Sequence, residues 1–138
     1  MINFEGTNRE LLNLYRGLEG VKDIKGSRFA MLVGKNMKEI RQILNPIEQA
    51  AVPSPAFQTV SIQMRDLVEA QDKEAMDQLE EDNKDLIEER KDQMKKVEDM
   101  LDESVTLQLH PVREDQLPDE ITGEQVEKIL QIITDGLD

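Results

Sequence analysis

Cysteine and tryptophan are absent from this sequence, and aromatic residues make up only 3% of it. Without cysteine, the chain can form no disulfide, no thiol nucleophile and no thiolate metal site. With so few aromatic rings, the core has to be built from leucine, isoleucine, valine and methionine. This composition favours helix-on-helix packing over a β-sandwich. At 138 residues the chain fits one domain with a modest core.

Long hydrophobic runs are also missing from the sequence. No apolar stretch approaches the roughly 20 residues that are needed to span a bilayer, so we expect no membrane insertion. The first five residues lack the basic segment and the apolar run of a signal peptide. We therefore expect a soluble protein of the cytoplasm.

The charge of the chain is acidic and unevenly distributed. The net charge is −13 at pH 7, and residues 66–103 carry 16 acidic against 6 basic side chains. Residues 1–50 carry 6 acidic and 8 basic side chains and are nearly neutral. An acidic segment of this kind favours a basic or polar protein partner, and it argues against direct binding to nucleic acid.

A short first helix is predicted over 7–18. Thr7 and Glu10 have the spacing of a capping box, and leucines at helical spacing follow them. Gly17 and Gly20 offer places for this helix to end.

A second helix is predicted over 27–50. Apolar residues recur every three or four positions from Phe29 to Ile47, which marks one buried face. Ser27 is the expected capping residue. Pro46 is expected to kink or end the helix, because proline lacks an N–H and clashes with the preceding turn.

The middle of the chain, 56–103, contains neither glycine nor proline, and it predicts one long helix over 57–102. Apolar stripes near its two ends are separated by the polar stretch 71–85. Since the second helix is about half as long, it could cover only half of this one. The long helix then either projects as a charged arm or breaks near 82–85 and folds back. The sequence leaves both arrangements open.

The period of the sequence changes after the acidic segment. Residues 105–109 alternate apolar and polar side chains, which predicts a half-buried strand that ends at Pro111. The short segment 2–4 is a candidate partner strand within the chain. If it does not pair, the strand is open to a strand from another chain.

A last helix is predicted over 122–134. Thr122 and Gln125 form a second capping box. The expected buried face includes Leu130, and Gly136 can end the helix.

Together these elements predict a mainly α fold. It is a helical hairpin or an antiparallel coiled coil, with a long acidic helix and a minimal two-stranded β element. We expect one domain over 1–138. Its parts are an N-terminal helical pair (1–55), the long acidic helix (56–103) and a strand with the C-terminal helix (104–138).

No motif of a known active site is present, and we expect no enzyme and no cofactor. His110 is the only histidine and has no nucleophile pattern near it, so a structural role is expected. No metal-ligand spacing occurs, and Asp82-Asn83-Lys84-Asp85 lacks the central glycine of a calcium loop. Gly34-Lys35 lacks the rest of a phosphate-binding loop.

Three surfaces remain as candidate binding sites, although a solvated helix face explains most of the acidic residues. An acidic surface for a protein partner would consist of Glu80, Glu81, Asp85, Glu88, Glu89 and Asp92. A strand edge would consist of Val105, Leu107 and Leu109. A candidate anion-binding cluster would consist of Arg9, Arg16, Lys22, Lys25 and Arg28.

The two ends of the chain carry patterns that go beyond composition. They are Leu11-Leu12-Asn13-Leu14-Tyr15, Lys25-Gly26 with Phe29-Ala30 and Lys35-Asn36, Leu107-Gln108-Leu109-His110, and Leu117-Pro118-Asp119-Glu120-Ile121-Thr122-Gly123. These segments resemble a family of small tailed-bacteriophage proteins of unknown function. The resemblance covers about half of the chain and implies a phage-encoded protein acting inside a bacterium. It implies no catalytic residues.

Three functions follow as hypotheses. The first is a non-enzymatic module, phage-encoded, that binds and inhibits a host factor such as a defence protein. The second is an accessory or chaperone of virion assembly, acting on tail or capsid and forming a homo-oligomer. The third is a small-molecule or nucleotide sponge built at an oligomer interface.

Overall fold

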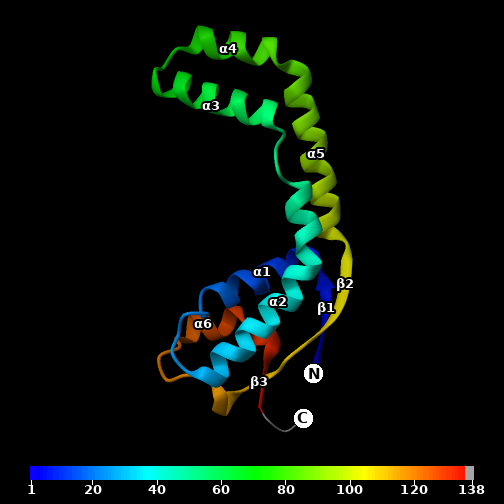
Figure 1. Ribbon diagram of the computed structural model, residues 1–138, viewed down its shortest axis with the longest axis vertical. Helices are drawn as coiled ribbons and strands as arrows, with labels where there is room; N and C mark the ends of the chain where they lie inside the picture. The colour runs from blue at the N-terminus through cyan, green and yellow to red at the C-terminus, as the bar shows by residue number, and fades with distance from the viewer. Residues whose placement is uncertain (136–138) are drawn as a thin grey trace. The chain divides into compact units, whose positions relative to one another are not determined.

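The computed structural model describes residues 1–135, and the fold over these residues is mainly α (Figure 1). Gly136, which was expected to end the last helix, lies outside the described residues. The elements in chain order are β1 (Ile2–Thr7), α1 (Asn8–Glu19), α2 (Ser27–Ala50), α3 (Pro55–Glu69), α4 (Lys73–Asp82), α5 (Lys84–Asp102), β2 (Ser104–Leu109), β3 (Val112–Arg113), α6 (Gly123–Lys128) and β4 (Ile133–Thr134).

Internal contacts divide the chain into two compact units. The first unit contains Met1–Pro46 and residues 100–135, and the second unit is Ile47–Asp99. The divisions fall inside α2 and α5. Most described residues of the predicted segments 1–55 and 104–138 therefore belong to the same unit. The assignment of the whole chain to one domain stays a prediction.

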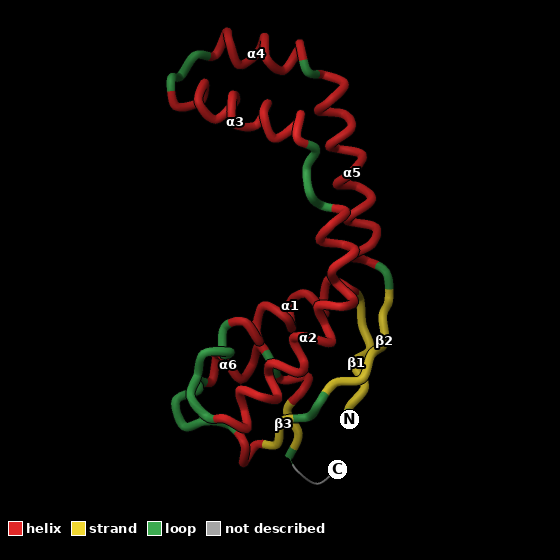
Figure 2. The backbone as a smooth tube through the Cα atoms, in the orientation of Figure 1, coloured by secondary structure: helices red, strands yellow, loops and turns green. Residues whose placement is uncertain are grey.

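An antiparallel ladder joins the two ends of the first unit. β1 pairs with β2 in a register that runs from Ile2 opposite Leu109 to Thr7 opposite Ser104. Figure 2 shows the two strands side by side. The predicted pairing of 2–4 with 105–109 is confirmed, and the ladder extends beyond it at the Thr7 end.

Asn8 continues this connection where the ladder ends. Its backbone N–H donates to the carbonyl of Glu103 at 2.9 Å, and its side-chain amide donates to the carbonyl of Met100 at 2.8 Å. Arg9 adds an ion pair with Asp102 at 3.4 Å. The start of α1 thus satisfies carbonyl groups at the end of α5, which have no partner within that helix. The Thr7–Glu10 capping box predicted for α1 is confirmed.

The hydrophobic core lies in the first unit, and α2 contributes its largest share. The spacing that predicted a helix over 27–50 is confirmed, and its apolar face is buried as expected. The buried apolar residues of this unit are Phe4, Leu11, Leu14, Leu18, Val21, Phe29, Val33, Met37, Ile40, Leu44, Leu109, Val112, Ile129 and Ile132.

Both ends of α2 differ in detail from the prediction. Gly26, not Ser27, occupies the position before the first helical residue, and its carbonyl accepts from the amide of Ala30 at 2.8 Å. Gly26 has φ +136°, a conformation that side chains other than glycine rarely adopt. Pro46 does not end the helix, which continues to Ala50. Proline removes one hydrogen bond there, and the residue is exposed, so water can satisfy the freed carbonyl.

The last predicted helix is shorter than expected. The Thr122–Gln125 capping box is confirmed, but α6 ends at Lys128 and a 3₁₀ turn follows. β4 then pairs in parallel with β3, with Val112 opposite Ile133. This long-range pairing replaces the end of the helix, and Leu130 is 58% exposed instead of buried.

The second unit contains three helices where one was predicted. A continuous helix over 57–102 is wrong. A break does occur near 82–85, at Asn83 between α4 and α5, and a further break at residues 70–72 separates α3 from α4. Gln71 has φ 55°, a left-handed backbone conformation that is uncommon for residues other than glycine. This conformation marks a tight turn between α3 and α4. After this turn, α4 lies side by side with α3 (Figure 1).

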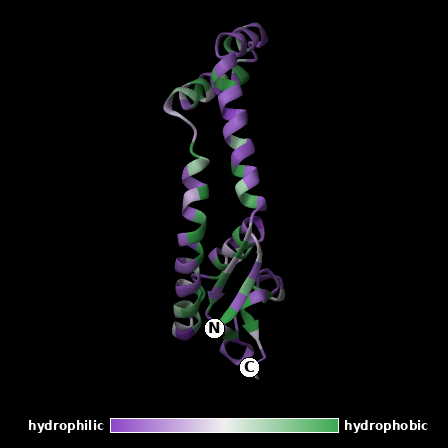
Figure 3. Cartoon of the chain, turned by 90° about the vertical axis from the view of Figure 1, so that its right-hand side faces the viewer, coloured by the Kyte–Doolittle hydropathy of each residue, from purple (hydrophilic) through white to green (hydrophobic). Residues whose placement is uncertain are grey.

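Burial in the second unit is sparse. Its buried apolar residues are Ile47, Val60 and Val97. The other apolar side chains on α3, α4 and α5 are half-buried or exposed. Figure 3 shows α5 mostly in the purple of hydrophilic residues. No helix among residues 1–135 is both long enough and apolar enough to cross a membrane.

Two glycines provide a matched test of the packing of α1 on α6. A Cβ on Gly17 would lie 2.7 Å from the backbone carbonyl oxygen of Lys128, whereas a Cβ on Gly34 would meet nothing within 4 Å. Gly17 therefore permits a close approach and does not end α1, which ends at Gly20, the other of the two predicted positions. Gly17→Ala should lower the free energy of unfolding by about 1–3 kcal/mol, because backbone must shift. Gly34→Ala, in the middle of α2, should raise it by about 0.5–1 kcal/mol.

Urea denaturation followed by circular dichroism checks this prediction. A Gly17→Ala variant as stable as the wild type would contradict the close packing of α1 against Lys128.

Candidate functional site

The strand edge predicted as a binding surface is partly used within the fold. β2 is paired with β1 along its whole length. Val105 and Leu107 are half-buried and Leu109 is fully buried, so these side chains face the interior of the first unit. The role of these residues in binding a partner stays a prediction. Within residues 1–135, the outer edges of β1 and β2 have no strand partner.

His110 serves the fold through its backbone. Asn36, which is 0% exposed, donates from its side-chain amide to the carbonyl of His110 at 2.9 Å. The backbone N–H of His110 donates back to the side-chain oxygen of Asn36 at 2.7 Å. These two hydrogen bonds hold the end of β2 against the middle of α2. It supports the structural role expected for this position.

The basic cluster is only partly brought together. Lys25 and Arg28 line one pocket at the start of α2, whereas Arg9 lies at the start of α1 and pairs with Asp102. Arg16 and Lys22 are exposed and do not line that pocket.

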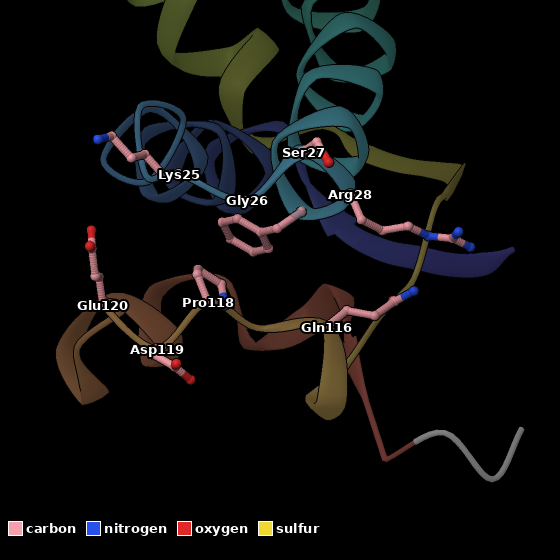
Figure 4. A pocket seen from close by; sticks show the side chains of 9 residues that line it. Lys25, Gly26, Ser27, Arg28, Gln116, Pro118, Asp119 and Glu120 are labelled. Carbon is pink, nitrogen blue, oxygen red and sulfur yellow. The ribbon is translucent and has the colours of Figure 1, made fainter.

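The pocket at the start of α2 has a volume of about 410 Å³. Figure 4 shows Lys25 and Glu120 on one side of it and Arg28 and Gln116 on the other. Since the two cations lie apart and Asp119 and Glu120 share the lining, the pocket has no concentrated positive charge. Phe29 and Pro118 supply its apolar part. Such a shallow pocket of mixed charge is a poor match for phosphate.

The acidic surface lies entirely in the second unit. All six of its carboxylates are exposed, two on α4 and four on α5. The four on α5 have i, i+3, i+4, i+7 spacing and share one face of that helix. No ion pair involves any of the six within the described residues. The residues are Glu80, Glu81, Asp85, Glu88, Glu89 and Asp92.

The charge around this surface is high for so small a unit. Residues 47–99 carry 15 acidic against 7 basic side chains, a net charge of −8. Glu69 with Lys73 and Asp92 with Lys96 have the i,i+4 spacing of helical ion pairs, but neither pair forms one within the described residues. The break at Gln71 separates the first pair onto different helices. The surface is therefore held at high negative potential.

Arg90 and Gln93 were not singled out from the sequence. Arg90 donates to the carbonyl of Ala51 at 2.8 Å, and its guanidinium lies 5.7 Å from the centre of the Phe57 ring. Gln93 donates to the carbonyls of Ala50 and Val52 at 2.8 and 2.7 Å. Together they satisfy carbonyl groups where α2 ends.

A signal for this pair was present in the sequence. Arg90 and Gln93 are polar residues three apart on the apolar face of α5, the face that includes Leu86 and Val97. Long polar side chains on such a face need partners, which the end of α2 provides.

Within the described part of the chain, no three carboxylate or histidine side chains come together in a way that could hold a metal ion. No family model matches this chain, and searches among curated proteins and solved structures find no similar protein. The resemblance to tailed-phage proteins therefore stays a prediction.

Substitution of Arg90 tests the capping of α2. Arg90→Leu should lower the free energy of unfolding by about 1–3 kcal/mol, because the Ala51 carbonyl loses a charged donor. Lys91→Leu changes the neighbouring exposed residue and should stay within about 0.5 kcal/mol of the wild type. Thermal and urea unfolding give both values, and equal losses would show that the Arg90 contacts contribute nothing specific.

Proposed function

We propose that this protein is a non-enzymatic, phage-encoded interaction module that binds a basic surface on a bacterial host protein and inhibits it. A defence protein is the expected kind of target. The observation that carries the proposal is the acidic surface of α4 and α5, where six exposed carboxylates form no ion pair with any described residue. Exposed carboxylates of this kind attract a basic partner and speed its association.

The distribution of roles between the two units supports this proposal. The first unit holds most of the buried apolar residues, and the second unit carries a net charge of −8 out of the −13 of the whole chain. Here α3 and α4 are taken as a helical hairpin whose second helix carries Glu80 and Glu81. A surface that contributes little to the core is free to be selected for binding.

Charge reversal at four positions tests the acidic surface. The variant carries lysine at Glu80, Glu81, Asp85 and Glu88. The yield of captured partner protein should fall at least about tenfold, because positive charges then face the basic surface of the partner. The measurement is a tagged pull-down from phage-infected bacteria, quantified by mass spectrometry. Unchanged capture would remove the acidic surface from the proposal.

A second variant with the same total charge is the control. Glu19, Asp23, Glu39 and Glu127 are exposed residues of the first unit, and their reversal to lysine should leave capture unchanged.

Enrichment of tail or capsid proteins, instead of a host protein, would favour the virion-assembly function. A preparation that captures no protein but binds nucleotides in calorimetry would favour the small-molecule function.

A further inference from the structure

The outer edge of β2 presents backbone groups that its pairing with β1 does not use. In an antiparallel ladder, opposite residues alternate between pairs that exchange two hydrogen bonds and pairs that exchange none. The backbone N–H of Asn8 donates to the carbonyl of Glu103 at 2.9 Å, and this pair continues the register of β1 with β2. Alternation from this hydrogen-bonded pair directs the N–H and C=O groups of Ser104, Thr106 and Gln108 away from β1.

Two further hydrogen bonds agree with this direction. Thr7 lies in a pair without hydrogen bonds, and its backbone N–H donates instead to Oε1 of Glu10 at 3.2 Å. His110 has the next outward position after β2, and its backbone bonds to the side chain of Asn36. Asn36 therefore closes the outer edge at His110. Among residues 1–135, the outward backbone groups between 104 and 108 have no hydrogen-bond partner.

The edge lacks the features with which proteins commonly prevent pairing of an exposed strand. These features are charged side chains, proline and β-bulges. β2 is uncharged and has no proline, and its register with β1 is regular over all six residues. The side chains of Ser104, Thr106 and Gln108 are exposed. Figure 2 shows β2 on the outer side of the pair, and no other strand among the described residues runs along it.

We propose that the outer edge of β2 pairs with β2 of a second copy of the chain. The contact is a two-fold symmetric, antiparallel ladder centred on Thr106, and it joins two two-stranded sheets into one sheet of four strands. It rests on the backbone geometry of β2 and does not depend on the acidic surface of α4 and α5.

The backbone groups of this edge complement themselves, as a two-fold contact requires. When Thr106 lies opposite Thr106 of the second copy, Ser104 lies opposite Gln108. Each residue with outward backbone groups then meets another such residue. At two hydrogen bonds in each of these pairs, the contact forms roughly six. No outward N–H or C=O group between 104 and 108 stays unpaired.

The side chains match in the same register. Val105 lies opposite Leu107 on the half-buried face, and threonine meets threonine on the exposed face. Two chains of net charge −13 repel each other, but no charged residue lies between 104 and 108. A basic strand of another protein would find no opposite charge on β2. The pattern of the edge therefore favours its own sequence as the partner.

The size of the contact sets the expected affinity. Each backbone hydrogen bond contributes little net free energy, because it replaces hydrogen bonds to water. A ladder of five residues is also much smaller than the roughly 800 Å² per partner of a standard interface. We therefore expect a weak dimer with a dissociation constant of roughly 10–300 μM.

Sedimentation equilibrium of the full chain tests the proposal with two matched proline variants. Thr106→Pro removes an outward N–H at the centre of the contact and leaves the bonds to β1 in place. It should raise the dissociation constant at least about tenfold, because both copies lose a donor there. Asn3→Pro removes an outward N–H on the opposite edge of the same sheet and should leave the constant unchanged. Circular dichroism checks that both variants fold.

Two results would overturn the proposal. One is a wild type that stays monomeric up to about 1 mM, well above the expected dissociation constant. The other is an equal effect of Thr106→Pro and Asn3→Pro on the dimer. If the wild type is monomeric and Thr106→Pro reduces the capture of a host protein, the edge binds a strand of that protein instead of a second copy.

Disulfide trapping tests the register without a proline. The chain has no native cysteine, so Ser104→Cys and Gln108→Cys each carry the only thiol. In the proposed register these positions face each other at a Cα separation of about 5.5 Å, which a disulfide can span. Under mild oxidation, a mixture of the two variants should cross-link at least about tenfold faster than either variant alone. Equal rates would contradict the antiparallel contact centred on Thr106.

The charge-reversal variant of α4 and α5 separates this contact from the proposed function. Its added lysines reduce the repulsion between two acidic chains, so it should dimerise at least as tightly as the wild type. Loss of the dimer in this variant would overturn the β2 contact. Loss of host-protein capture with an intact dimer would support both proposals.

Discussion

The antiparallel pairing of β1 with β2 is the contact on which the first unit depends, and a buried asparagine lies at each end of it. Asn8 follows the Thr7–Ser104 end and satisfies carbonyls of α5. Asn36 binds the backbone of His110 just beyond the Ile2–Leu109 end. Both asparagines are buried polar residues, at 7% and 0% exposure. Since a buried amide is costly unless it is hydrogen-bonded, the bonds of Asn36 and of the Asn8 side-chain nitrogen favour this register of the ladder, whereas the buried side-chain oxygen of Asn8 has no hydrogen-bond partner among the described residues.

The two units use different means to keep their helices in place. The first has a core of fully buried apolar side chains, while the second relies mostly on half-buried side chains and on Arg90 and Gln93 at the end of α2. This difference matches the distribution of charge. Carboxylates crowd the helices that bury little, and the segment before them, 49–64, has no charge at all. Two kinds of surface are thereby available on one small unit.

Local signals in the sequence predicted local structure well. Thr7 and Thr122 both form the capping boxes that their spacing indicated, and the apolar face of α2 is buried. The break at Gln71 was missed because neither glycine nor proline marks it, although Asp72 directly after it caps α4 by accepting from the backbone N–H of Ala75. The end of α6 was missed for another reason. Ile129 and Ile133 fit a helical period, but pairing of β4 with β3 depends on residues far away in the chain.

The candidate surfaces show the same limit of local reasoning. Exposure of the six carboxylates on α4 and α5 follows from an amphipathic pattern, so it could be predicted. The basic residues near the N-terminus are close in sequence, yet Arg9 and Lys25 belong to different sites, because Arg9 lies in the first turn of α1 beside Asp102 and Lys25 lies just before α2. Likewise, the hydrogen bonds between Asn36 and the backbone of His110 could not be predicted from the sequence, because the two residues are 74 positions apart and meet only in the folded chain.

The order of the units along the chain has a consequence for synthesis on the ribosome. β1 and α1 emerge first, but β2, their partner, emerges only after the whole second unit. Helices with local contacts form early, whereas a strand that pairs across a long stretch of chain must wait. Until Leu109 has been translated, the leucines of α1 and the apolar face of α2 stay exposed to solvent. Chaperones can bind these apolar side chains on the nascent chain.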